Sequence, residues 1–475
     1  MLVTFISPYS DITAYGIRIL SATMRKANIQ TRLIFLSDMD NKNGHSTYGN
    51  DVLREVLNLC ADSNLIGISL FSCHFPKIAD LTERIKKNLS TPIVWGGKHP
   101  SAKPEEALKY ADIICIGEGE TAIVELTQKM ENNKPFYDTN NFWFKKNGEI
   151  IKNSLRPLTQ DLDTLPFPDY SLEEHYIWDK DSAMMLKMDE SVFKRFLFKE
   201  PDTGLVVYNT LASWGCPYAC TYCFSFRDMY KGKRYLRFRS INNIIDEIEG
   251  IKNRFFFIGK IILSDDNFFT LKTEDIKAFA KAYKERIGLP IRCLAHPINL
   301  TEEKVSIMLD AGLSHIQMGV QTGSEKIKKI YQRNTPNDTI LNAVHILNKF
   351  KKKIIPSYDF IVDDTYETDE DVVETLRFLL KFPRPYHINV FSLTLYPGTE
   401  LYNKAVKNGV PFDENKEWEA RKKTYLNIIF LLFNSCVPRV ILRIMITRPM
   451  LKIFGNKFIT SFLYQMIALL QKARK

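Results

Sequence analysis

The sequence predicts an α/β protein with a doubly wound parallel sheet at the N-terminus, then a partial (β/α)6 barrel and a helical C-terminal tail. Two observations carry the prediction of the sheet and the barrel. Apolar, strand-like runs alternate with amphipathic, helix-like runs over residues 1–130 and again over 205–406. Helices between consecutive strands impose parallel pairing, and such sheets and barrels bind their ligands at the carboxyl ends of the strands.

The N-terminal alternation supplies five strands. We expect these strands at 2–7, 31–37, 65–71, 91–97 and 111–117, with helices near 15–27, 51–60, 77–88 and after 121. Gly96 and Gly97 end one strand, and Gly117 and Gly119 end another. Glycine at such positions lets the backbone approach a ligand closely or turn tightly.

Residues 131–204 have a different character. A short hairpin is expected around Asn147-Gly148, because this dipeptide favours tight turns. The stretch DLDTLPFPDY that follows is irregular, so we predict that residues 131–204 form a linker with little regular structure.

The second alternation supplies six strands and five helices. The expected strands are 205–213, 255–266, 290–296, 315–322, 353–362 and 387–396, and the expected helices are 241–253, 273–287, 301–311, 337–351 and 369–382. Their strict alternation predicts a barrel or partial barrel with its chemistry at the carboxyl ends of the strands.

The composition is that of an ordinary globular protein of two or three domains, with 475 residues, of which 45% are hydrophobic and 25% charged. Five of the eight cysteines stand singly, and we expect most of them to be buried core thiols in a reducing compartment. These five are Cys60, Cys73, Cys115, Cys293 and Cys436. The N-terminus MLVTFISPYS lacks the features of a secretory signal, so we expect a cytoplasmic protein.

The other three cysteines lie in SWGCPYACTYCF, residues 213–224, directly after the first strand of the predicted barrel. Structural zinc needs four ligands, and no second cysteine pair lies nearby. A disulfide would leave one thiol unpaired and is disfavoured in a reducing compartment. A [4Fe–4S] cluster normally takes one thiolate on each iron, so Cys216, Cys220 and Cys223 would leave one iron open to an outside ligand.

The spacing C-x3-C-x2-C in CPYACTYC, with an aromatic residue before the last cysteine, resembles the signature of the radical S-adenosylmethionine (SAM) superfamily. In that family the open iron chelates SAM, and an electron from the cluster cleaves SAM to a 5′-deoxyadenosyl radical. The resemblance implies that Cys216, Cys220 and Cys223 hold a [4Fe–4S] cluster and that Tyr222 packs near the adenine. It assigns residues 205–406 to a radical SAM core.

Two further loops fall where that family contacts SAM. SDDNFF follows the second barrel strand, which implies Asp265 and Asp266 as acceptors for the SAM ammonium group. GVQTGSE follows the fourth strand and implies Gln321 and Ser324 as contacts for the ribose or the carboxylate. The structural alternatives are a solvated turn for the aspartates and a helix cap for Ser324.

The loop after the fifth strand departs from the family. Many relatives have a Gly-x-Pro turn there, whereas this chain has Asp363, Asp364 and Thr365. The sequence therefore does not predict the adenine contact that relatives make from this loop. LYPGTELY after the sixth strand matches a recurrent family motif and is expected to shape that loop.

The N-terminal segments GISLFS and VWGGKHPSAKPEEALKYADIICIGEGE resemble the cobalamin-binding domain of one radical SAM subclass. The resemblance implies a cobalamin-binding, Rossmann-like domain over residues 1–130, with Ser69, Gly96 and Gly97 bordering the dimethylbenzimidazole tail. The D-x-H-x-x-G sequence that supplies an axial histidine in other cobalamin folds is missing, so we expect base-off binding without one. His74 and His99 are expected to be polar surface or turn residues.

The net charge of +10 belongs to the C-terminal region 407–475, because residues 421–475 hold eleven Lys and Arg and no Asp or Glu. Their apolar runs are too short to span a bilayer. Short, basic, apolar helices predict peripheral contact with the inner face of a membrane through 421–475, and a helical cap on the barrel is the alternative. The basic residues lie among Ile, Leu and Phe, so no nucleic-acid partner is expected.

Together these observations predict a cobalamin-dependent radical SAM enzyme. Methyl transfer to an unactivated carbon is the most common chemistry of the subclass, and rearrangement or cyclisation also occurs. The implied partners are a small-molecule or lipid substrate and an electron donor such as flavodoxin or ferredoxin. The alternatives are a radical SAM enzyme that does not use cobalamin and a metal-binding, membrane-associated scaffold without catalysis.

Overall fold

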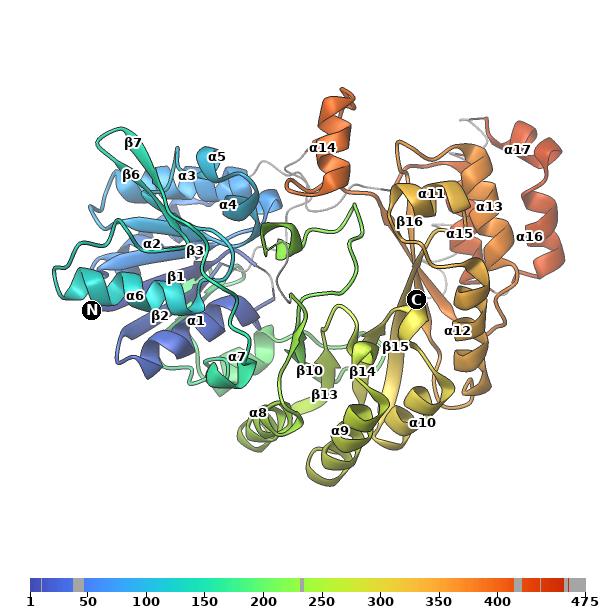
Figure 1. Cartoon of the computed structure of the whole chain (residues 1–475), viewed down its shortest axis with the longest axis horizontal. Coiled ribbons are helices and arrows are strands. Elements are labelled where there is room, and N and C mark those ends of the chain that lie inside the picture. The colour runs from blue at the N-terminus through green and yellow to red at the C-terminus, as the bar shows by residue number, and fades with distance from the viewer. Residues whose placement is uncertain are drawn as a thin grey trace.

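The computed structural model describes residues 1–9, 11–36, 47–230, 235–413, 421–435, 437–456 and 460. They form two α/β domains that lie side by side, with helix α14 (Glu400–Lys407) between them at one end (Figure 1). Cys436 and residues 461–475 of the predicted tail lie outside the described residues.

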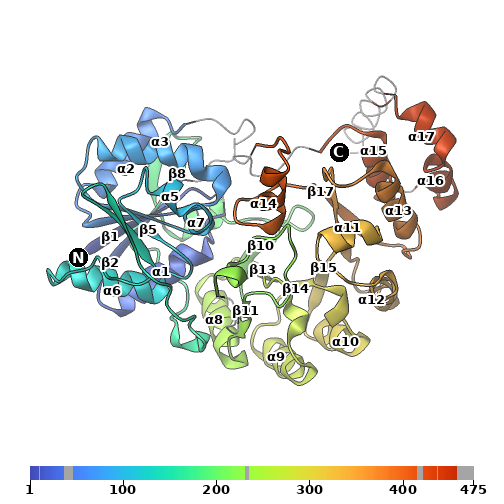
Figure 2. The ribbon, with the colours of Figure 1, turned by 45° about the horizontal axis from the view of Figure 1, so that its top comes forward.

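The N-terminal sheet has nine strands, in the order β7-β6-β5-β4-β3-β1-β2-β8-β9. Its predicted elements are β1 (Leu2–Ser7), β2 (Gln30–Phe35), β3 (Leu65–Ser69), β4 (Ile93–Gly96), β5 (Ile113–Cys115), α1 (Tyr15–Lys26), α2 (Asn50–Cys60), α3 (Phe75–Lys86), α4 (Lys98–Ala102), α5 (Pro104–Ala107) and α6 (Glu120–Glu131). β1 to β5 pair in parallel, as predicted. Most residues of these five strands are apolar and buried, since helices cover both faces of the sheet (Figure 2).

Residues 131–204, predicted as a linker with little regular structure, extend this sheet on both edges instead. The added elements are β6 (Phe142–Lys146), β7 (Glu149–Lys152), β8 (His175–Asp179), β9 (Met184–Lys187) and α7 (Glu190–Phe196). The predicted hairpin is confirmed between β6 and β7, and its Asn147 and Gly148 both have positive φ. β8 pairs with β2, and its alternation of buried and half-buried residues is the strand signal that the prediction missed.

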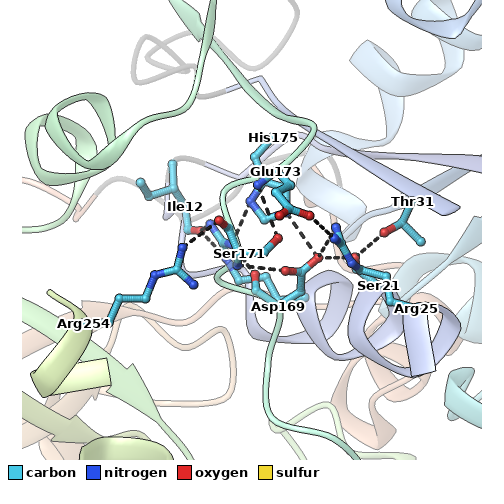
Figure 3. A network of polar contacts seen from close by, with 10 residues as sticks. Ile12, Ser21, Arg25, Thr31, Asp169, Ser171, Glu173, His175 and Arg254 are labelled. Atoms are coloured by element: carbon cyan, nitrogen blue, oxygen red, sulfur yellow. Dashed lines mark hydrogen bonds and ion pairs between the residues drawn. The ribbon is translucent and has the colours of Figure 1, made fainter. Parts of the chain in front are cut away.

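A buried polar network fastens these added residues to α1 (Figure 3). The carboxylate of Asp169 accepts a hydrogen bond from Ser21 Oγ at 2.6 Å and lies 3.3 Å from His175 Nε2. Arg18 is fully buried and donates from Nη1 to the Asp169 carbonyl at 2.6 Å. On the barrel side, Arg254 donates at 2.7 Å to the carbonyl two residues beyond Asp169. The segment around Asp169 therefore contacts both domains.

The predicted partial barrel is confirmed as a parallel sheet in the order β10-β13-β14-β15-β16-β17. Its strands are β10 (Val206–Thr210), β13 (Ile258–Leu263), β14 (Ile291–Ala295), β15 (Leu313–Gln321), β16 (Ser357–Val362) and β17 (His387–Ser392). Its helices are α8 (Ile241–Arg254), α9 (Thr273–Arg286), α10 (Glu302–Asp310), α11 (Glu325–Ile330), α12 (Asn337–Lys349) and α13 (Asp369–Leu379). A small antiparallel hairpin, β11 (Ser213–Trp214) with β12 (Arg237–Phe238), lies at the cysteine loop.

The C-terminal region is helical, as predicted, and divides into two parts. Its helices after α14 are α15 (Tyr425–Phe433), α16 (Arg439–Met445) and α17 (Arg448–Phe454). α15 belongs to the barrel core, because Phe430 is 1% exposed and its ring centre lies 5.8 Å from that of Phe360 in β16. α16 and α17 instead leave large apolar side chains about half exposed. No helix of the described residues is long and apolar enough to cross a membrane.

Asn434, directly after α15, takes the place of a neighbouring strand at the open edge of β17. Its side chain accepts from the Ile388 N–H at 2.7 Å and donates to the Ile388 carbonyl at 2.8 Å. Asn434→Ala is expected to lower the free energy of unfolding by about 1–3 kcal/mol, because two backbone groups lose their partner. Chemical denaturation measures this loss. The exposed Asn408→Ala is the control, expected within about 0.5 kcal/mol of the wild type, and equal stability of the two variants would contradict the prediction.

Candidate active site

The three cysteines lie in the loop after β10, at the end of the barrel where enzymes of this architecture carry their chemistry. Cys216 and Cys220 are half-buried, Cys223 is exposed, and all three are free thiols. Gly215 precedes them with a φ of 93°, and a Cβ at this position would lie 2.7 Å from the carbonyl oxygen of Tyr235. Only glycine fits there, so the turn into the cysteine loop is set by the hairpin beside it.

The donor set suits an iron–sulfur cluster better than a single metal ion. Burial, with Asp266 and the neighbouring thiols adding to it, raises the pKa of Cys216 to about 12. The Cys216 thiol therefore needs a strongly cationic group to ionise it. Among the described residues, no three His, Cys, Asp or Glu side chains are grouped to hold one ion. A cubane cluster, in contrast, takes each thiolate on a separate iron.

Arg333 places a cation beside the cysteine loop. Its Nη1 lies 3.7 Å from Cys220 Sγ and 3.5 Å from Tyr222 Oη, and its Nη2 donates to the Gly319 carbonyl at 2.6 Å. Tyr222 packs edge-on against Tyr331 with ring centres 4.9 Å apart, and its contact with adenine stays a prediction. Sequence analysis missed Arg333 because no local motif marks it, and only the closure of the barrel brings it to the loop.

Asp265 and Asp266 take different positions at the end of β13. Asp265 is 1% exposed and accepts hydrogen bonds from the Ala212 N–H at 3.1 Å and from Ser213 Oγ, so it fastens the entry to the cysteine loop. Burial raises its pKa to about 6. Asp266 is instead exposed and lines a hollow between the domains. The predicted ammonium contacts stay predictions, and Asp266 is the better placed of the two.

Gln321 and Ser324 lie at the end of β15. Gln321 has a φ of 73°, and the pairing of β15 with β16 shifts register there. Ser324 is fully buried and donates to Asp371 Oδ1 at 2.9 Å, which joins the start of α11 to α13. It is the residue before α11, but its side chain makes no cap hydrogen bond. Both SAM contacts stay predictions, and the Ser324 hydroxyl already has a protein partner.

The loop after the fifth barrel strand lacks the Gly-x-Pro turn of many relatives, and the structure gives a reason for this difference. Asp363 has a φ of 63°, and its carboxylate accepts from Ser392 Oγ at 2.6 Å, the Lys422 N–H at 2.8 Å and Asn427 Nδ2 at 2.7 Å. The loop that holds Gly-x-Pro in many relatives thus anchors the start of the C-terminal region here. In the next loop, a Cβ on Gly398 would lie 2.5 Å from the Phe224 ring, so this loop packs against the cysteine loop.

Two adjoining hollows open between the N-terminal sheet and the barrel. The first has a volume of about 490 Å³, and Ser69, Gly96 and Gly97 line it together with Trp214 and Asp266. The second has about 480 Å³ and shares Ser69 and Gly97 with the first. The structure therefore brings the predicted cobalamin-side residues to the mouth of the barrel. The predicted residues that line neither hollow are Cys216, Cys220, Tyr222, Cys223, Asp265, Gln321 and Ser324.

His74 and His99, expected at the surface or in a turn, are both buried instead. His99 is stacked on Phe75 with ring centres 4.4 Å apart. Lys98, which sequence analysis missed although it follows Gly97 directly, lines both hollows. Its Nζ lies 5.7 Å from the ring centre of Phe224, the residue after Cys223. Lys98 therefore joins the N-terminal domain to the cysteine loop.

His315 on β15 makes a pH-dependent contribution to stability. It is hydrogen-bonded through Nε2 to Ser357 Oγ at 2.9 Å, and burial, with Arg292 and Lys260 nearby, lowers its pKa to about 4. The unfolded chain takes up this proton near pH 6.5 and the folded chain only near pH 4. Stability is therefore fully present above pH 6.5 and falls as the pH drops, by about 1–2 kcal/mol at pH 5.

His315→Gln is expected to make the unfolding midpoint less dependent on pH between 7.5 and 5, and chemical denaturation at these two pH values measures the difference. Wild type and variant with parallel pH profiles would rule out His315 as the cause.

Comparison with known families settles the class of this architecture. A model of the Radical SAM superfamily matches residues 213–379, and a model of the B12 binding domain matches residues 1–127. The chain contains a radical SAM domain. It carries a B12-binding domain before the radical SAM core, as the sequence predicted. This radical SAM protein is an enzyme, so the alternative of a non-catalytic scaffold is not retained.

Relatives and solved structures agree with the assignment. The radical SAM protein is 27% identical to an uncharacterized methyltransferase of Pyrococcus horikoshii, over 75% of this chain and 70% of the relative. It is 23% identical to the bacteriochlorophyllide d C-8(2)-methyltransferase of Chlorobaculum tepidum, over 78% and 74%. Among structures, the cobalamin-dependent enzyme OxsB superposes with a TM-score of 0.69 and 16% identity, covering 99% of this chain and 75% of OxsB. The methyltransferase TsrM of Kitasatospora setae gives 0.64 and 15%, covering 87% and 76%. These two likenesses concern the fold.

Proposed function

We propose that this enzyme transfers a methyl group from SAM to an unactivated carbon of a small molecule, using a [4Fe–4S] cluster and cobalamin. The observation that carries the proposal is the first hollow, where Ser69, Gly96 and Gly97 of the B12-binding domain and Trp214 and Asp266 of the radical SAM core line one cavity. A corrin held by the first set would stand at the mouth of the barrel. The methyltransferases among the relatives support the reaction class.

When bound, the cluster supplies the electron that cleaves SAM and the corrin carries the methyl group. The residues of the chain bind, orient and exclude water. Cys216, Cys220 and Cys223 would hold the cluster, and Arg333, 3.7 Å from Cys220 Sγ, offsets thiolate charge. Asp266, which is exposed and lines the hollow, would accept a hydrogen bond from an ammonium group there.

Anaerobic reconstitution with iron, sulfide and hydroxocobalamin, followed by reduction with SAM and candidate substrates, tests the proposal. Methyl transfer of this kind consumes two SAM molecules, so 5′-deoxyadenosine and S-adenosylhomocysteine should accumulate in step with a methylated product. Rearrangement or cyclisation would give 5′-deoxyadenosine without S-adenosylhomocysteine. An unchanged corrin absorption spectrum on mixing would favour the alternative of a radical SAM enzyme without cobalamin.

The electron donor we propose is an acidic protein of the flavodoxin or ferredoxin class. The segment RDMYKGKRY, residues 227–235, follows the cysteine loop and is rich in Lys and Arg. Arg227 donates from Nη1 to the Pro217 carbonyl at 3.1 Å, which places its charge beside the loop. Arg227→Gln should slow 5′-deoxyadenosine formation several-fold with reduced flavodoxin and leave it unchanged with dithionite. Equal slowing with both reductants would refute a docking role.

We also propose peripheral contact of the C-terminal region with an anionic membrane, which would suit a lipid substrate. Val440, Ile441, Ile444 and Ile453 on α16 and α17 are 65%, 47%, 50% and 52% exposed. The same two helices carry Arg439, Arg443, Arg448 and Lys452 and no acidic residue. An apolar surface among cations is what an anionic lipid surface binds.

Vesicle co-sedimentation of the full chain tests this contact. Combined Val440→Ser, Ile441→Ser and Ile444→Ser substitutions should weaken binding to phosphatidylglycerol vesicles about tenfold, because apolar area is lost from the face. The control is Val406→Ser, since Val406 on α14 is 55% exposed and lies outside the two helices. Binding of the triple variant equal to that of the control would reject the contact. A chain truncated after Lys407 would not be a suitable test of membrane contact, because the truncation also removes α15, which belongs to the barrel core.

A further inference from the structure

An ion pair between Glu118 and Arg237 joins the loop after β5 to the barrel domain. Arg237 of β12 donates from Nη1 to Glu118 Oε2 at 2.9 Å and from Nη2 to Oε1. Arg237 is 2% exposed, and it also donates to the carbonyls of Thr159 and Tyr235 at 2.8 and 3.2 Å. A two-pronged contact of a guanidinium with a carboxylate fixes orientation as well as distance.

On the barrel side, Arg237 is connected directly to the cysteine loop. It is the register partner of Trp214 in the β11–β12 hairpin, and Trp214 stands two residues before Cys216. The guanidinium carbon of Arg237 lies 5.8 Å from the Trp214 ring centre. A movement of Arg237 would therefore move the start of the cysteine loop.

On the sheet side, Glu118 is held in the loop that ends β5. Asn141 donates to the Glu118 carbonyl at 2.8 Å, and the Glu118 N–H donates to Tyr230 Oη at 3.4 Å. The preceding Gly117 has a φ of 77°, and a Cβ there would lie 2.3 Å from Tyr230 Oη. The loop is thus packed against Tyr230 of the barrel domain at Gly117 and is held by Asn141 of its own domain at Glu118.

Glu118, Arg237 and Trp214 all line the first hollow, beside Gly96 and Gly97. One wall of the predicted corrin site is therefore built by residues of the barrel. We propose that the Glu118–Arg237 pair is the positioning element that holds the corrin-binding loops against the cysteine loop, so that a corrinoid binds tightly only when the pair is intact. This inference rests on the proposed function, because it takes the hollow as the corrin site.

The dissociation constant of hydroxocobalamin, measured by absorption on the reconstituted full chain, tests the proposal. Glu118→Gln and Arg237→Gln should each raise the constant at least about tenfold. Because the two residues act through one contact, the double variant should lose no more affinity for hydroxocobalamin than either single variant. Arg237→Lys keeps the positive charge but cannot make the two-pronged contact, so its dissociation constant should fall between those of the wild type and Arg237→Gln.

The matched control is Arg32→Gln, which breaks a pair with Asp62 and Glu174 in the same sheet at residues that line neither hollow. The dissociation constant of Arg32→Gln should stay within about twofold of the wild type, because residues remote from the hollow and without shared partners do not couple to it. Unchanged constants in the Glu118 and Arg237 variants would overturn the proposal, and so would additive losses, which indicate two independent contacts with the ligand. If the wild type itself binds no hydroxocobalamin, the proposed function fails instead.

Discussion

Alanine in place of Cys216, Cys220 or Cys223 is expected to abolish SAM cleavage. The reconstituted wild type should hold about four irons per chain and each variant fewer than about one, because a cubane with two protein thiolates is poorly held. Formation of 5′-deoxyadenosine under reduction should fall to the rate without enzyme. Iron analysis and the visible absorption of the cluster measure the first effect, and chromatography of the SAM products measures the second.

The control for the cysteine variants is Cys60→Ala. Cys60 is free, fully buried in the N-terminal domain and far in sequence from the cluster loop. This variant should lose some stability through its cavity while it keeps iron and SAM cleavage. Retention of the full iron content in a Cys216, Cys220 or Cys223 variant would show that the cluster ligands lie elsewhere.

Tryptophan at position 16 is expected to weaken hydroxocobalamin binding about 10- to 100-fold by filling the hollow. Gly16 lies in the first turn of α1 and lines both hollows, and a Cβ at this position meets nothing within 4 Å. The indole would therefore extend into space that the ligand needs. Because glycine is a poor helix former, the substitution should leave thermal stability unchanged or raise it slightly.

Gly16→Ala serves as the matched control, because a single methyl group occupies little of the hollow. It should bind hydroxocobalamin like the wild type and share any stability gained in α1. If Gly16→Trp is stable and binds as tightly as Gly16→Ala, then the corrin does not enter the two hollows. A titration followed by visible absorption distinguishes these outcomes.

The candidate site could be proposed from sequence because its signals are local. The spacing of Cys216, Cys220 and Cys223 is readable in eight residues, and the glycines after β4 stand beside the strand that they end. Both domains were confirmed because alternation of strands and helices has a clear period. The elements of such units pack in one way, which makes the fold follow from their order.

The residues that sequence analysis missed take their roles from distant contacts. Arg333 reaches Cys220 across more than a hundred residues, and Glu118 reaches Arg237 across a similar span. Neither contact leaves a mark in the neighbouring sequence. Asp363 illustrates the same limit. The sequence shows that the Gly-x-Pro turn is missing. The reason, that Asp363 binds Asn427, is visible only in the folded chain.

The linker was predicted wrongly for a physical reason. β6 and β8 have only five residues each, and β8 lies between turns at Leu172, Glu174 and Ala183, which all have positive φ. The alternation in such short strands repeats too few times to stand out from the irregular sequence around it. Their membership in the sheet depends on the free edges of β2 and β5, which no local pattern records.

The extension of the sheet beyond residue 130 changes which piece of the chain can be exchanged between proteins. A fragment cut at that point would lack β8, which leaves the edge of β2 open to pairing with other chains. It would also bury the Arg18 guanidinium without the Asp169 carbonyl that it binds. The portable corrin-binding module is therefore residues 1–187, which a chimera with a different barrel would have to carry whole.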